Sequence, residues 1–260
     1  MGKQQQTYLI SATVFVVALA LRTIPLYWSP LPFNIDGFHF VSHAEFITSL
    51  GQVPSETRYF HADEYVFSIL LTIVGYFTGS QAIQIAQPLI AVIGSIPCIL
   101  AVSVSQKIGR QLGWTPTKIR LAAAISGLLL AVEGIYLGRS AAVTSEGLGL
   151  VFVYLLAIVL FKALKSDRSS WKLLSCLLVL SLPLTHTLST IVGVLVVTGL
   201  VMRSVRYSET RSVIFGLFLC ITYWSYMILY YSLKEVNEIS RVSGTPGLFL
   251  AWILLLILLS

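Results

Sequence analysis

The sequence predicts an all-α, polytopic membrane protein. Of its 260 residues, 56% are hydrophobic and only 11% are charged, whereas a soluble domain carries about 25% charged residues. The apolar runs are continuous, and several approach the length of about 20 residues that a helix needs to cross a bilayer. They lack the alternating segments of about 10 residues that typify a membrane barrel. We therefore expect a single transmembrane domain over residues 1–260.

The charges indicate the orientation of this domain. The basic residues lie at the ends of apolar runs, where topology signals occur, so the net charge of +6 does not predict a nucleic-acid partner. Gln106–Arg120 contains four cations and no acid, which predicts a cytoplasmic loop. Tyr27–Glu64 contains one arginine and five acids, which predicts an external loop. The N-terminus is then expected to be cytoplasmic.

Five runs are long enough to be spans. The first has no small-residue cleavage site before Pro25, so we expect a retained helix rather than a cleaved signal peptide. The apolar run Tyr65–Gly79 is shorter, and a crossing there would place the four-cation loop outside. We place it on the external leaflet, within a first external loop covering residues 27–81. The predicted spans are Tyr8–Leu26, Ile83–Ser105, Ile119–Leu137, Val143–Leu164 and Val213–Leu233.

The run Leu173–Met202 has cations on both sides, so we predict that it enters the membrane and returns. Two short helices of about 22 Å each would turn near Pro183, which interrupts a helix, and bring His186 to the external rim. These crossings make seven in total. Residues 247–260 begin an eighth span, and these 14 residues are too few to cross, so we expect an incomplete last span.

This topology gathers titratable side chains on the external face. Ionisable groups at a membrane are costly to hold away from water and are functional candidates for that reason. Some acids of the first loop, such as Glu45, are expected only to face water. The candidates are Asp36, His39, His43, His61 and Glu64 from the first loop, Arg139 and Glu146 from the loop between the third and fourth spans, and His186 from the hairpin turn.

Within the first loop, Asp36, His39 and His43 have the spacing of one helix face. We predict an interfacial helix whose polar face turns towards a pocket. The two histidines also have a zinc-ligand spacing, although no third ligand is identified, which leaves a membrane zinc hydrolase as an alternative. The apolar residues expected to face lipid are Phe40, Val41, Ala44 and Ile47.

Two motifs resemble the GT-C superfamily of membrane glycosyltransferases, and are closest in pattern to the catalytic subunits of oligosaccharyltransferases. IDGFHFVSHAEFITSLGQVP is similar to the family's first external loop, with Asp36 at its catalytic aspartate, Glu45 at its glutamate and Pro54 at its proline. GRSAAVTSEG is similar to its second motif, with Arg139 matched and Glu146 where the family has aspartate. The predicted architecture, with a long first loop and short fifth and sixth spans, is a third likeness.

The chain also departs from the family pattern. A histidine follows Asp36 by three residues rather than four, Gly37 stands where the family has proline, and the paired acids of the second motif are reduced to Glu146. The family's soluble acceptor-recognition domain has no counterpart in these residues. Transfer of an oligosaccharide to asparagine is therefore not implied, even if the fold is shared.

The resemblance implies a glycosyltransferase that uses a lipid-linked sugar donor, a polyprenyl phosphate or pyrophosphate, at the external membrane face. Asp36 would act as a base or as an orienting carboxylate on the acceptor. Arg139 would bind the phosphate, because a guanidinium can hold two oxygens at once. Asp36 and Glu146 would together ligate Mg²⁺ or Mn²⁺, and His186 and His61 would add further contacts to the donor or its surroundings.

Other interpretations stay open. The chain could be a non-catalytic or truncated relative that binds lipid-linked sugars, or a transporter, although transporters place their polar groups near the midplane. The individual residues have structural alternatives as well. Asp36 could cap the following helix, Arg139 and Glu146 could form a structural ion pair, and His186 could hydrogen-bond to the turn backbone.

Overall fold

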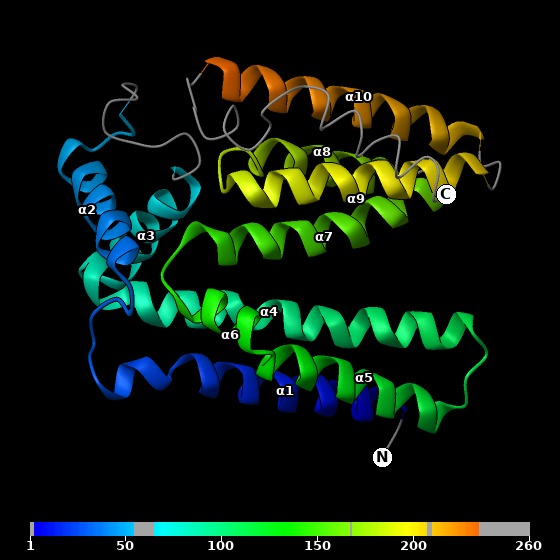
Figure 1. Ribbon diagram of the computed structural model, residues 1–260, viewed down its shortest axis with the longest axis horizontal. Helices are drawn as coiled ribbons and strands as arrows, with labels where there is room; N and C mark the ends of the chain where they lie inside the picture. Colours follow the sequence, from blue (N-terminus) through cyan, green and yellow to red (C-terminus); the bar gives the residue numbers. More distant parts are fainter. Residues whose placement is uncertain (1–2, 55–64, 167, 207–209, 234–260) are drawn as a thin grey trace.

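The structure, a computed structural model, describes residues 3–54, 65–166, 168–206 and 210–233. Within these ranges the chain forms helices and connecting turns, with no strand. The long helices and the shorter α8 lie along one axis of the molecule, and each of them runs in the opposite direction to the preceding one, while α2 and α3 lie together at one end (Figure 1). The predicted all-α class is therefore confirmed.

Helices of this length and composition indicate a protein embedded in a membrane. Five of them are long and apolar enough to cross a bilayer, or six if the bent pair α5–α6 forms one span. The helices are α1 (Lys3–Arg22), α2 (Ile35–Leu50), α3 (Tyr65–Thr78), α4 (Ala82–Gln111), α5 (Pro116–Val132), α6 (Gly134–Ala141), α7 (Ser145–Lys165), α8 (Ser169–Ser181), α9 (Thr187–Arg206) and α10 (Thr210–Leu233), with a 3-10 turn at Ile24–Tyr27.

The two ends of the helix bundle differ in what they contain. One end, which we call the loop end, contains the connections at residues 23–34, 79–81, 142–144 and 182–186, together with α2 and α3. The opposite end, which we call the basic end, contains the connections at residues 112–115 and 166–168. The chain alternates between these ends, as the predicted order of spans requires.

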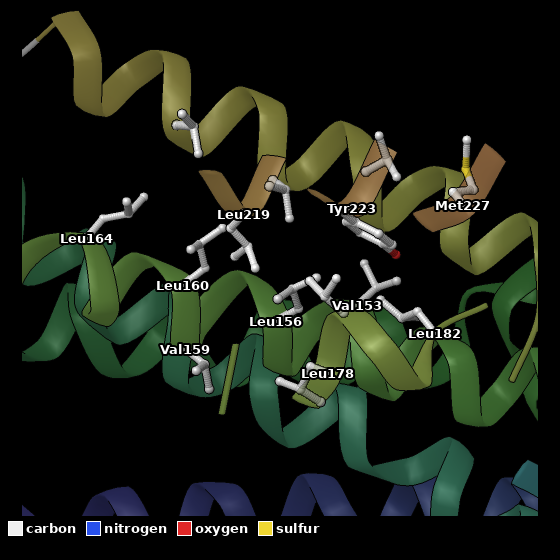
Figure 2. Close-up of a cluster of buried hydrophobic side chains, with 14 residues drawn as sticks. Val153, Leu156, Val159, Leu160, Leu164, Leu178, Leu182, Leu219, Tyr223 and Met227 are labelled. Carbon is white, nitrogen blue, oxygen red and sulfur yellow. The ribbon is translucent and has the colours of Figure 1, made fainter. Parts of the chain in front are cut away.

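Three clusters of buried apolar side chains hold the bundle together. One joins α1, α4 and α5 through Val14, Cys98 and Ala123. Another joins α7 to α8, α9 and α10, with Tyr223 at its centre (Figure 2). The third, which includes Phe67, lies at the loop end and joins α2 and α3 to α4 and α7. The first half of the bundle therefore meets the second half through a packed core at the loop end.

The third predicted span is broken rather than straight. We expected one helix over Ile119–Leu137, but α5 and α6 meet at an angle of 61°. Glu133 leaves the helical conformation between them, and its carboxylate accepts hydrogen bonds from the backbone N–H groups of Ile135 and Tyr136, at 3.1 and 2.6 Å. This acid stops one helix and caps the next, so the expected span is bent at Glu133 rather than one straight helix.

The predicted hairpin exists, but its two arms are unequal. The turn covers residues 182–186, as expected from Pro183, and α8 has 13 residues. Helix α9 has 20 residues and is long enough to cross the membrane, so the prediction of two short helices is wrong for the second arm. The turn lies slightly before the middle of the run, and α9 continues past Met202 to Arg206. The expected incomplete span at residues 247–260 lies outside the described residues.

Candidate functional site

Asn34 joins the first loop to the connection between α6 and α7. Its side-chain oxygen accepts a hydrogen bond from the N–H of Val143 at 2.8 Å, and its amide nitrogen donates to the Val143 carbonyl at 3.4 Å. Asn34 occupies the N-cap position of α2, yet its side chain makes no capping hydrogen bond there. It satisfies a distant backbone instead, and so fixes the start of α2 beside the start of α7.

Gln87 provides a second link between the same two segments. Its side chain is fully buried within α4. The side-chain oxygen accepts from the N–H of Phe33 at 2.9 Å, and the side-chain nitrogen donates to the carbonyl of Ala141 at 2.8 Å. One amide thus satisfies a donor from the first loop and an acceptor from the end of α6.

These two links fix the position of the first turn of α2, which contains Asp36. Its neighbour Gly37 lies so close to the α6–α7 connection that an added Cβ would stand 2.9 Å from Val143 Cβ and 2.5 Å from Pro32 Cβ. Asp36 lies in the first turn of α2 and is exposed, and the N-cap residue is Asn34 rather than Asp36. Asp36 is therefore not the N-cap of α2, and it is an exposed acid in the first turn of that helix.

Arg139 and Glu146 meet across that connection. Nη1 of Arg139 lies 3.3 Å from Oε2 of Glu146, so the two side chains form an ion pair. Glu146 is mostly buried, with 16% of its side chain exposed, whereas Arg139 is 68% exposed. The guanidinium therefore keeps most of its surface free while the carboxylate beneath it holds its position.

Arg22 is a residue that the sequence interpretation missed. It is fully buried at the end of α1, where its Nε donates to Ser140 Oγ at 2.8 Å and its guanidinium lies 5.0 Å from the centre of the Tyr136 ring. One Nη of Arg22 has no hydrogen-bond partner among the described residues. These contacts hold α6, and with it Arg139, against α1. The only sequence signal was a single cation at the end of an apolar run.

His186 joins the same end of the molecule from the hairpin turn. Its Nδ1 lies 3.1 Å from Ser189 Oγ and accepts from the Ser189 N–H at 3.3 Å, so it caps the first turn of α9. A Cβ added at Gly149 of α7 would stand 3.1 Å from His186 Cβ and 2.7 Å from Ser189 Cβ. The turn therefore packs against α7, one turn after Glu146.

The start of α3 also reaches this turn. The backbone N–H of Val66 donates to the carbonyl of Leu184 at 3.3 Å. Burial raises the pKa of the neighbouring Tyr65 phenol above its usual value, so this group stays protonated at neutral pH. The first loop, the α6–α7 connection and the hairpin turn thus come together at the loop end.

The helix α2 differs from its predicted orientation. His39 is exposed and its ring centre lies 4.0 Å from that of His43, but His43 is buried. The four apolar residues expected to face lipid are buried instead, and Phe40, Val41 and Ala44 pack against α3, α4 and α7. Phe40, for example, packs its ring against Phe67 with 5.2 Å between the ring centres. The apolar face of α2 belongs to the protein core because α3 and α4 cover it.

Two of the predicted site residues, His61 and Glu64, lie outside the described residues. Among the residues that the structure describes, no three histidine, cysteine, aspartate or glutamate side chains gather closely enough to hold a metal ion. The zinc alternative for His39 and His43 therefore gains no third ligand from these ranges. Asp36 and Glu146 lie on adjoining segments, and carboxylate oxygens are the donors that Mg²⁺ and Mn²⁺ prefer.

Comparison with known proteins adds no relative. No protein-family model, curated protein or solved structure matches the chain.

Proposed function

We propose that the protein is a membrane glycosyltransferase of GT-C type, which transfers a sugar from a polyprenyl phosphate or pyrophosphate to an acceptor at the external membrane face. The observation that carries this proposal is the meeting of three separate segments at the loop end. Two of them contain the motifs that resemble the family, around Asp36 and around Arg139 and Glu146. The third contains His186.

The side chains at this end suit the chemistry of a phosphate leaving group. Such a group needs charge stabilisation more than protonation, and a preorganised cation supplies it. Arg139 is exposed and is held by Glu146 on one side, so it can approach a phosphate without rearranging its backbone. The positive-inside distribution of charge orients the loop end towards the external face.

Asp36 would accept the proton of the acceptor nucleophile or orient it for attack on the sugar. Its exposure leaves room for an acceptor to approach. A divalent cation held by Asp36 and Glu146 would supply further stabilisation to the leaving phosphate. Two carboxylates form only part of the coordination shell of Mg²⁺, which commonly keeps several waters and binds substrate phosphates.

Transfer from radiolabelled polyprenyl-phosphate sugars in membranes containing the full chain tests the proposal. Replacement Asp36→Asn should lower the transfer rate by at least about 100-fold, the usual contribution of general-base catalysis. Asp36→Glu should retain part of the activity, and Ser42→Ala, an exposed position of the same helix, should retain all of it. Equal rates for the unchanged chain and Asp36→Asn would remove Asp36 from the mechanism.

Arg139 and the metal are tested in the same assay. Arg139→Gln should lower kcat as well as raise the KM for the donor, because the phosphate is bound before transfer and gains negative charge during it, and Arg139→Lys should recover part of the loss. Chelation should stop transfer, and Mg²⁺ or Mn²⁺ should restore it. Transfer that survives complete chelation would exclude the metal role of Asp36 and Glu146.

A second candidate function is the binding of lipid-linked sugars without transfer. It is favoured by the reduction of the second motif's paired acids to Glu146, and the described residues offer no three-ligand group. This alternative predicts that a polyprenyl-phosphate sugar binds with an affinity that depends on Arg139, and that no product forms under any metal condition. Transport is less well supported, because the ionisable groups described above lie at one end rather than near the midplane.

A further inference from the structure

Two adjoining pockets lie at the basic end, opposite the site discussed above. The first has a volume of about 540 Å³ and lies between the end of α4 and the connection from α7 to α8. The second has a volume of about 620 Å³ and lies between α4 and α5 on one side and α7 and α9 on the other. They share three lining residues, Lys107, Gln111 and Phe161, so they form one continuous surface.

The first pocket, which we call the head pocket, is surrounded by positive charge. Five of its nine lining residues are cations, namely Lys107, Arg110, Lys162, Lys165 and Arg168. The acid that precedes Arg168 in the sequence, Asp167, lies outside the described residues. Cations this close together repel one another, so a bound anion would stabilise the arrangement.

Aromatic rings hold several of these cations in place. Lys162 Nζ lies 4.1 Å from the centre of the Trp171 ring, and Lys165 Nζ lies 4.6 Å from that of Phe161. An ammonium held over a ring face keeps donors on its other side, because it carries three N–H groups. A carboxylate partner would neutralise the charge, whereas a ring leaves it available to a ligand.

The second pocket, which we call the groove, has a different lining. It is mostly apolar, with Ala101, Val104, Ala157 and Leu200 among its walls, and its volume is within the range of ordinary ligand sites. Arg203 joins Lys107 at its border, and its guanidinium lies 5.9 Å from the centre of the Phe161 ring. The groove therefore leads from an apolar interior to a basic mouth.

We propose that the head pocket and the groove together bind one acidic membrane phospholipid, with its phosphate among the cations and one acyl chain between α4 and α7. Charge complementarity and the continuity of the two pockets support this occupant. Topology signals explain cations near helix ends, but they do not require five of them around a hollow that continues into an apolar groove. Basic pockets between membrane helices are known to suit such headgroups, and the cytoplasmic leaflet supplies anionic lipid.

The test is lipid binding by the purified full chain in nanodiscs of neutral phosphatidylcholine, titrated with phosphatidic acid. Lys162→Gln combined with Lys165→Gln should weaken the binding of phosphatidic acid by about tenfold or more, because each lysine near an anionic headgroup contributes to the binding free energy. The matched control, Lys118→Gln combined with Lys172→Gln, removes two lysines that line neither pocket. It should change the affinity by less than about twofold, as expected of screened charges. Equal losses in both double variants would overturn the site in favour of diffuse surface attraction.

A second variant separates the groove from the head pocket. Ala157→Phe fills the groove and should weaken the binding of phosphatidic acid while leaving a short-chain analogue of the same headgroup unaffected. Inorganic phosphate that competes as well as the lipid would show an anion site without a chain. A polyprenyl phosphate that displaces phosphatidic acid at equal concentration would identify a different occupant. Either result overturns the proposal, and neither depends on sugar transfer.

Discussion

The loop end and the basic end use polar side chains in opposite ways. At the loop end, the side chains of Asn34 and Gln87 form hydrogen bonds with backbone groups of other segments, and these segments pack closely around Gly37. At the basic end, lysines stack on aromatic rings around two hollows. The hydrogen bonds at the loop end fix the relative positions of its segments. The cation–π contacts at the basic end leave the lysine charges and the pocket volume available to a ligand. Side-chain amides thus join the segments of the loop end, whereas the cations of the basic end line pockets.

The strongest test of this comparison is Gln87→Leu. The substitution removes the partner of two backbone groups, the Phe33 N–H and the Ala141 carbonyl. Each buried group left without a partner costs about 1–3 kcal/mol, so we expect the free energy of unfolding to fall by about 2–4 kcal/mol. Denaturant unfolding in detergent micelles measures it. Gln84→Leu on the exposed side of the same helix is the matched control, and an equal loss there would show that the buried links are unimportant.

Close packing at the loop end is tested by a pair of glycines. Gly37→Ala places a Cβ 2.5 Å from Pro32 Cβ, and we expect a loss of about 1–3 kcal/mol, the usual effect of overpacking. Gly138→Ala in α6 meets no atom within 4 Å and should be neutral or stabilising by up to about 1 kcal/mol. Thermal unfolding of the two variants measures both changes in stability. A harmless Gly37→Ala would mean that the first loop and the α6–α7 connection are free to separate.

The ion pair of Arg139 and Glu146 should contribute little to stability. Arg139 is mostly exposed, and exposed pairs contribute about 1 kcal/mol or less. We expect Glu146→Gln to change the free energy of unfolding by less than this amount, while transfer or donor binding falls strongly. Unfolding and donor-binding measurements on one preparation separate the two effects. A large loss of stability with unchanged donor binding would return this pair to a structural role.

The smallest effect on stability is expected at the basic end. Lys162→Gln removes one cation–π contact with Trp171, which contributes about 0.5–1 kcal/mol when exposed, and it also relieves repulsion among five cations. The two effects oppose each other, so we expect a net change below about 0.5 kcal/mol in lipid-free detergent. Thermal unfolding checks this value, and a loss as large as that of Gln87→Leu would contradict the contrast between the ends.

Much of the fold was predictable because it follows from local patterns. Apolar length located four of the five long helices, namely α1, α4, α7 and α10, Pro183 located the hairpin turn, and loop charge paired the connections into two ends. The bend at Glu133 was not predicted. In the sequence, a glutamate that caps the following helix looks the same as one that only faces water at the membrane surface. The length of α9 was missed because the helix continues past Met202, where the apolar run ends, to Arg206.

The site was predictable only in part. The sequence determined which segments carry titratable residues, and it determined that Arg139 and Glu146 are close, since a short connection separates them. Tertiary structure alone decided that His43 is buried and His39 exposed, because other helices cover one face of α2. It also decided the roles of Asn34, Gln87 and Arg22. Their partners lie 54 to 118 residues away, and nothing in a local pattern records which distant backbone an amide or a guanidinium will satisfy.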